Sequence, residues 1–171
     1  METETNSRWA GLSRLAHRTI TAWAFAGGVV LFGVVAVNVF SVAGGIFWKP
    51  FPGDFELTEI GVAIAAFSFL PYCQLTGANV TADIFTSRAP PSWIAAFSIL
   101  ASLVALGFSL LLLSRMFYGM LDQKAFGYTT AILAIPHWMA FVPILVSLAL
   151  LALAAILTLT EAVSTVGRRA I

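Results

Sequence analysis

Four long apolar stretches constrain this chain more than any other feature. They cover roughly residues 19–45, 56–76, 93–118 and 128–160. A helix of about 20 residues crosses a hydrocarbon core about 30 Å thick, and each stretch is at least that long. Charged residues make up only 10% of the chain, against about a quarter of an ordinary soluble domain. We therefore predict an all-α integral membrane protein, with four transmembrane helices in a single membrane domain that comprises residues 1–171.

The distribution of basic residues predicts the orientation, because cytoplasmic segments retain Lys and Arg. Four crossings place both termini on one side of the membrane. The segments predicted to share that side carry most of the basic residues, namely Arg8, Arg14, Arg18, Arg88, Arg168 and Arg169. The other side carries Lys49 and Lys124, with Arg115 near the end of the third stretch. Both termini are therefore predicted to be cytoplasmic.

Residues 1–18 form a cytoplasmic or interfacial segment before the first stretch. From Trp9 onward, apolar residues recur at helical spacing, while Arg14 and Arg18 fall on the opposite arc. This pattern suits a short amphipathic helix in the interface, with Trp9 among the acyl chains and the arginines at the headgroups. A cytoplasmic extension of the first transmembrane helix explains the same residues.

A second interfacial helix is expected in the loop over residues 77–91, where several apolar side chains share one face. Asp83 and Arg88 lie in the same loop and are candidates for a salt bridge or a helix cap. Trp93 follows at the start of the third stretch, and Trp48 lies in the first external loop. Both tryptophans are expected to anchor the protein at the membrane surface.

Carboxylates gather at the start of the second stretch. Asp54 can cap the helix, and Glu56 lies in its first turn, where the macrodipole favours a negative charge. Glu59 lies one turn further in, where partial loss of hydration requires a partner from another helix or another subunit. In the first stretch, Asn38 is expected to hydrogen bond to a neighbouring helix.

Two features concern the third and fourth stretches. Arg115 lies about 33 Å along a helix from Trp93, so its side chain can extend to the far interface; the other interpretation is a substrate-binding arginine inside a pore. The fourth stretch is longer than one crossing requires. It is expected to tilt, to break, or to begin as an external helix before Pro136.

The residues needed for several kinds of functional site are missing from the sequence. Haem requires two facing axial ligands, but we expect His17 at the cytoplasmic interface and His137 about 13 Å deep from the other side. The single cysteine, Cys73, excludes a dithiol redox site. The sequence has no metal-ligand cluster, nucleophile–base spacing or phosphate-binding glycine loop. A net charge of +1 gives no basis for nucleic-acid binding. We expect no enzyme and no cofactor in this chain.

The location of the ionisable residues favours a supporting subunit. A self-contained transporter is expected to carry polar or ionisable groups near the bilayer midplane, frequently on broken helices. Here these groups lie at the ends of the stretches.

The sequence around the second stretch resembles a known family. The segment FELTE, from Phe55 to Glu59, and the later segment QLTGANVTAD, from Gln74 to Asp83, are similar to the DctQ-type small membrane subunit of tripartite ATP-independent periplasmic (TRAP) transporters. The family frequently has a Trp-x-Glu-Glu start, which differs from the sequence here. Asn79 stands where the family frequently has a histidine, whereas Asp83 matches.

The resemblance implies a subunit of an uptake system in the bacterial inner membrane. In such systems a periplasmic binding protein delivers a small organic acid to a large DctM-type permease, which carries the substrate and Na⁺ sites. The small subunit supports the permease within the lipid bilayer and has no catalytic, cofactor or metal residue.

On this resemblance, Lys49, Asp54, Glu56 and Glu59 are candidate contacts at the periplasmic face, and Asp83 and Arg88 are candidates for cytoplasmic structure. Two alternatives remain open: a cofactor-binding membrane anchor of a redox complex, and a free-standing small permease. In that permease Glu59 or Arg115 would line the path.

Overall fold

A computed structural model describes residues 2–49, 51–78 and 91–169. It contains four helices: α1 (Glu2–Phe47), α2 (Asp54–Thr76), α4 (Pro91–Ala125) and α5 (Trp138–Arg169). Each contains a stretch long and apolar enough to cross a membrane. Within the described residues, the only β pairing is an isolated bridge between Thr129 and Pro136. The prediction of an all-α protein with four membrane-spanning helices is confirmed.

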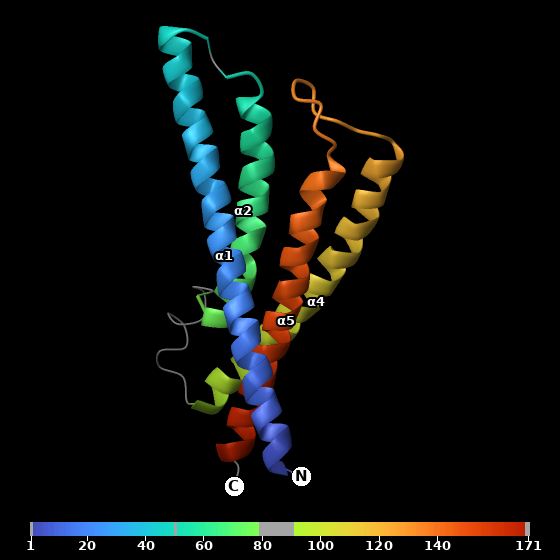
Figure 1. The fold of residues 1–171 in the computed structure, drawn as a ribbon. Helices are drawn as coiled ribbons and strands as arrows, with labels where there is room; N and C mark the ends of the chain where they lie inside the picture. The colour runs from blue at the N-terminus through green and yellow to red at the C-terminus, as the bar shows by residue number, and fades with distance from the viewer. Residues whose placement is uncertain (1, 50, 79–90, 170–171) are drawn as a thin grey trace.

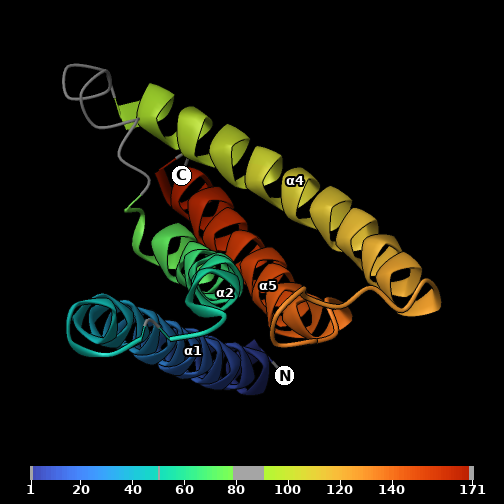
Figure 2. The same ribbon diagram turned by 90° about the horizontal axis from the view of Figure 1, so that it is seen from above.

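The helices form a row in the order α1, α2, α5, α4 (Figure 2). The inner helix α5 packs on both α2 and α4, whereas α1 packs mainly on α2 and touches α5 only slightly. The surface of the row is apolar, and phenylalanines such as Phe25, Phe32 and Phe40 are more than 70% exposed. Such a surface suits lipid or a partner protein rather than water.

Along the direction of the helix axes, both termini lie at one end of the molecule, and the α1–α2 and α4–α5 connections lie at the other end (Figure 1). We call these the terminal end and the loop end. The arrangement agrees with four crossings. That the terminal end faces the cytoplasm remains a prediction from the basic residues.

The N-terminal segment is part of α1, which runs without interruption over 46 residues, or about 69 Å. A separate interfacial helix before the first span is therefore absent, and the alternative, an extension of the first helix, describes the structure. No proline interrupts this part of the chain. Arg14 and Arg18 are exposed on it. The side chain of Trp9 lies outside the described residues.

The second expected interfacial helix, with Asp83 and Arg88, lies outside the described residues. So does the side chain of Trp93, although its backbone belongs to α4.

Small residues let α1 and α2 approach closely. A Cβ atom added to Gly27 of α1 would lie 2.6 Å from the Cβ of Ser68, and one added to Gly61 of α2 would clash with the side chain of Val34. No larger residue fits at either glycine without moving the helices apart. Small residues at the contact between two membrane helices let their backbones approach closely in this way.

Polar side chains join neighbouring helices along the row. The amide of Asn38 on α1 donates to the Thr58 hydroxyl on α2 at 2.7 Å, which confirms the interhelical bond expected for Asn38. Trp23 on α1 donates to Ser147 on α5 at 2.9 Å. Inside an apolar environment these bonds fix which faces meet, because an unpaired polar group is costly there.

The fourth apolar stretch does not begin as a helix. From Phe126 to His137 the chain forms a loop, with left-handed backbone at Gly127 (φ 64°) and Ala134 (φ 51°), and α5 starts only at Trp138. Thus no external helix precedes Pro136. Proline disfavours helical backbone at the preceding residue and has no N–H to donate, so a helix does not run through Ile135 into Pro136.

His137 accordingly lies just before α5, where its N–H donates to the carbonyl of Tyr128 at 3.0 Å. It is not about nine residues inside a helix, as the sequence suggested. His17 lies toward the terminal end of α1, so the two histidines lie toward opposite ends of the helices.

Candidate partner interface

Asp54 links α2 to α1 at the loop end. Gly53, with φ 83°, occupies the N-cap position and Asp54 is the first helical residue, so the side-chain cap expected from Asp54 is not formed. Instead its carboxylate accepts hydrogen bonds from the hydroxyl of Ser41 on α1 and from the N–H of Phe55, the latter at 2.8 Å. Ser41 is buried, so this bond holds the start of α2 against α1.

Gly53 is required at this turn for two reasons. Its positive φ favours a residue without a side chain. A Cβ atom there would also lie 2.5 Å from Cγ of Leu133, which belongs to the loop between α4 and α5. The start of α2 therefore packs directly against that loop.

Glu56 completes the contact with the same loop. Its two carboxylate oxygens accept the N–H groups of Ile132 at 2.7 Å and of Leu133 at 3.0 Å. Such charge-assisted bonds to backbone amides are stronger than neutral ones. Glu56 thus joins the start of α2 to loop residues that lie 76 and 77 positions later in the sequence.

Glu59 has a different environment. It is exposed, and it lies on one stripe of α2 with Phe55, Val62, Ala66 and Leu70, which are also exposed. We call these five residues the α2 stripe. Among the described residues, the carboxylate of Glu59 has no hydrogen bond or ion pair. It is the only charged member of the stripe.

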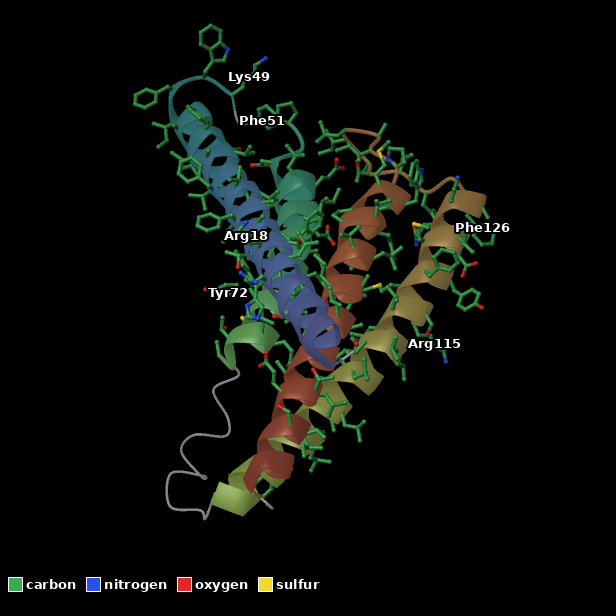
Figure 3. All side chains as sticks on the ribbon, turned by 60° about the horizontal axis from the view of Figure 1, so that its bottom comes forward. Arg18, Lys49, Phe51, Tyr72, Arg115 and Phe126 are labelled. Carbon is green, nitrogen blue, oxygen red and sulfur yellow. The ribbon has the colours of Figure 1, made fainter. Side chains whose placement is uncertain are left out.

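The tip between α1 and α2 extends beyond the rest of the row. The bond between Ser41 and Asp54 places the start of α2 level with a point about 9 Å before the end of α1, and Figure 1 shows α1 reaching past it. Beyond this level Trp48 is 89% exposed, and Lys49 and Phe51 are also exposed (Figure 3).

Arg115 is exposed on α4 and points away from the row (Figure 3). Tyr118, one turn further along, is also exposed, at 66%. The arrangement is compatible with an arginine that extends toward the loop-end interface. In this structure it does not line a path through the row.

The described residues contain no group of three His, Cys, Asp or Glu side chains that could hold a metal ion. Sequence reasoning did not find Ser41 or the loop residues Ile132 and Leu133. A buried serine has no distinctive sequence signal, and the loop residues take part through their backbone amides, which every sequence contains.

These features define a class of protein, a small multi-pass membrane protein. Its polar side chains form hydrogen bonds between its own helices and loops, and one carboxylate is exposed on an apolar stripe. The family model for the DctQ component of tripartite ATP-independent periplasmic transporters matches residues 31–165. The chain belongs to this family and is a small subunit of a TRAP transporter, which confirms the resemblance seen in the sequence. The family is a transporter component and not an enzyme family. A comparison with curated proteins found no match, and a comparison with solved structures found none either.

Proposed function

We propose that this chain is the scaffold for a large DctM-type permease, and that Glu59 is a central contact between the two. The complex takes up a small organic acid delivered by a periplasmic binding protein and uses a Na⁺ gradient. It lies in the bacterial inner membrane with both termini of this chain in the cytoplasm. The observation that carries the scaffold role is the exposed carboxylate on the α2 stripe.

The position of Glu59 supports a protein partner. It lies about 7 Å inside the start of α2, between the exposed apolar residues Phe55 and Val62. A charge on a lipid-facing helix is unfavourable, by up to about 3 kcal/mol near the bilayer centre on insertion scales. An arginine, lysine or hydrogen-bond donor on a membrane-spanning helix of the permease would remove this cost.

The arrangement of the helices supports the same proposal. A closed four-helix bundle directs the inner face of every helix into one core. In the row, the inner helix α2 is flanked by α1 and α5 and still keeps an exposed stripe. An extended surface of this kind suits a scaffold that lies alongside a larger membrane protein.

Asp54 and Glu56 are engaged within the chain, so the proposal gives them the role of shaping the loop end. Lys49, on the exposed tip beside Trp48, is the proposed contact for the binding protein. This assignment predicts that Lys49→Glu weakens uptake while the two membrane subunits still copurify.

Copurification tests the scaffold role. Glu59→Leu removes both charge and hydrogen-bonding capacity, so we expect the permease to be lost from the affinity-purified small subunit and uptake in cells to fall. Glu59→Gln keeps the hydrogen bonds of an amide and is expected to lie between the wild type and Glu59→Leu. Asp122→Asn is the matched control, because Asp122 is an exposed carboxylate on α4, away from the α2 stripe.

Unchanged copurification and uptake with Glu59→Leu would remove Glu59 from the interface. Uptake by this chain alone in liposomes would overturn the scaffold role itself, since a supporting subunit transports nothing without its permease.

A further inference from the structure

An apolar groove opens between α1 and α2, on the part of α2 nearest the terminal end. Its volume is about 360 Å³, and it is lined by Thr21, Ala24, Phe25, Gly28, Phe69 and Tyr72. Phe25 is 72% exposed and Tyr72 is 40% exposed, so the groove faces the surroundings of the row. None of these residues takes part in the partner interface described above.

Two adjacent glycines have opposite roles here. Gly27 packs against Ser68 and holds the two helices together, whereas a Cβ atom added to Gly28 would meet nothing within 4 Å. The groove is open because Gly28 has no side chain to occupy this space. A larger side chain at this position could fill it without forcing the helices apart.

Arginines lie on the same face of α1 as the groove. Positions 14, 18, 21, 25 and 28 are spaced by four and three residues in turn, which places them along one face of a helix. Arg18 is one turn from Thr21, about 4.5 Å along the axis, and Arg14 is one turn further. Figure 3 labels Arg18 and Tyr72, from the two helices that form the groove.

Arg18 and Tyr72 have side-chain donors free to bind a ligand at this end of the groove. Among the described residues, neither the guanidinium of Arg18 nor the hydroxyl of Tyr72 has a hydrogen bond or ion pair. Arg18 is exposed on α1. A cation thus lies next to an apolar groove, at the end from which a lipid headgroup would approach.

We propose that this groove binds an acyl chain of an anionic phospholipid, whose phosphate is held by Arg18 with support from the Tyr72 hydroxyl. Basic residues beside a crevice between membrane helices attract anionic headgroups, and the apolar lining replaces the lipid environment of the chain. The proposal does not depend on the partner of Glu59.

The size of the groove favours a lipid chain over a partner helix. Thr21 and Gly28 are about 10 Å apart along α1, and a helix about 10 Å across would occupy roughly 800 Å³ over that length. The groove is smaller than this. An extended acyl chain is much thinner, and it lies naturally with its headgroup toward the arginines.

Native mass spectrometry of the purified full chain can test the proposal, with phosphatidylglycerol and phosphatidylethanolamine of identical acyl chains as probes. We expect the wild type to retain phosphatidylglycerol in preference. Gly28→Leu should abolish this preference by filling the groove. Arg18→Gln should lower phosphatidylglycerol binding by about fivefold, the effect of one cation near an anionic surface.

Matched controls separate the groove from general lipid binding. Gly33→Leu adds the same side chain at another glycine of α1 with nothing within 4 Å of its Cβ position, and Lys49→Gln removes a cation at the loop end. Both should bind as the wild type does. If Gly28→Leu fails to fold, Gly28→Ala, which the open space accommodates, should still reduce binding.

Equal binding of the two lipids by the wild type would overturn the proposal, as would unchanged phosphatidylglycerol binding in folded Gly28→Leu or in Arg18→Gln. Loss of permease copurification in Gly28→Leu with lipid binding unchanged would identify the groove as a protein contact instead.

Discussion

At the residue scale, carboxylates that are close in sequence have separate roles. Asp54 bonds to α1, Glu56 bonds to the loop between α4 and α5, and Glu59 faces outward on the α2 stripe. Helical periodicity explains why Asp54 differs from the other two, because it lies about 160° from Glu56 and about 140° from Glu59 around the axis. Glu56 and Glu59 are only about 60° apart, and what separates them is the neighbour each one meets: the loop between α4 and α5 lies beside Glu56 and does not reach Glu59. The sequence placed all three at one helix start but could not distinguish their partners.

The Glu56 interaction predicts a local change in dynamics. Glu56→Ala removes both acceptors of the Ile132 and Leu133 amides, so these amides should exchange hydrogen for deuterium faster than in the wild type. Hydrogen–deuterium exchange with mass spectrometry measures this on the peptide that contains residues 126–137. Glu59→Ala is the control and should leave the exchange unchanged; equal exchange in both variants would show that the Glu56 bonds do not hold the loop.

At the element scale, α5 holds the row together through α2 and α4. Thr158 on α5 lies at the centre of this connection, because its hydroxyl accepts from Gln74 of α2 at 3.1 Å and lies 3.2 Å from the Ser102 hydroxyl of α4. One polar group therefore links three helices. The order of the helices in the row depends on interhelical hydrogen bonds of this kind, because in lipid no hydrophobic force holds helices together.

Thr158→Val should weaken this three-helix connection. Interhelical hydrogen bonds in membrane proteins average about 0.6 kcal/mol and reach about 1.7 kcal/mol, so we expect a loss of about 1 kcal/mol in the free energy of unfolding in detergent. Thr160→Val is the matched control on the same helix, because the Thr160 hydroxyl is exposed and donates to the carbonyl of Leu157 within α5. A similar loss in both variants would assign the effect to helix propensity rather than to the connection.

At the scale of the whole molecule, the row has two different ends. The loop end is tied together by Asp54 and Glu56, and the terminal end carries the arginines of α1 beside the proposed lipid groove. The positive-inside rule predicts that the terminal end lies in the cytoplasm.

Fusions at the C-terminus test this orientation. A green fluorescent protein fused after residue 171 should fluoresce in a bacterial host, and alkaline phosphatase at the same position should be inactive, because it folds only in the periplasm. Active phosphatase at the C-terminus would reverse the orientation and place the tip with Lys49 in the cytoplasm.

The sequence by itself determined the membrane class, the number of helices and the family. Hydropathy is a local property that depends on about 20 consecutive residues, and the family motif is also short. The sequence also indicated that Asn38 pairs with another helix, which the structure confirms. For Glu59 it predicts a partner outside the residue's own helix. The sequence placed the start of the fourth helix too early. The loop before Trp138 is as apolar as the start of a helix, and only the backbone conformation around Pro136 distinguishes the loop from the helix.

Only the tertiary structure decided the order of the helices, the partner of Glu56 and the groove beside Gly28. Each depends on residues far apart in sequence that meet on particular helix faces: Glu56 meets amides 76 and 77 residues away, and Gly28 lies opposite Phe69 and Tyr72. The sequence does not distinguish Gly27 from Gly28. Their roles separate only once α2 lies against one face of α1, because the fold brings Ser68 against Gly27 and leaves the space beside Gly28 open.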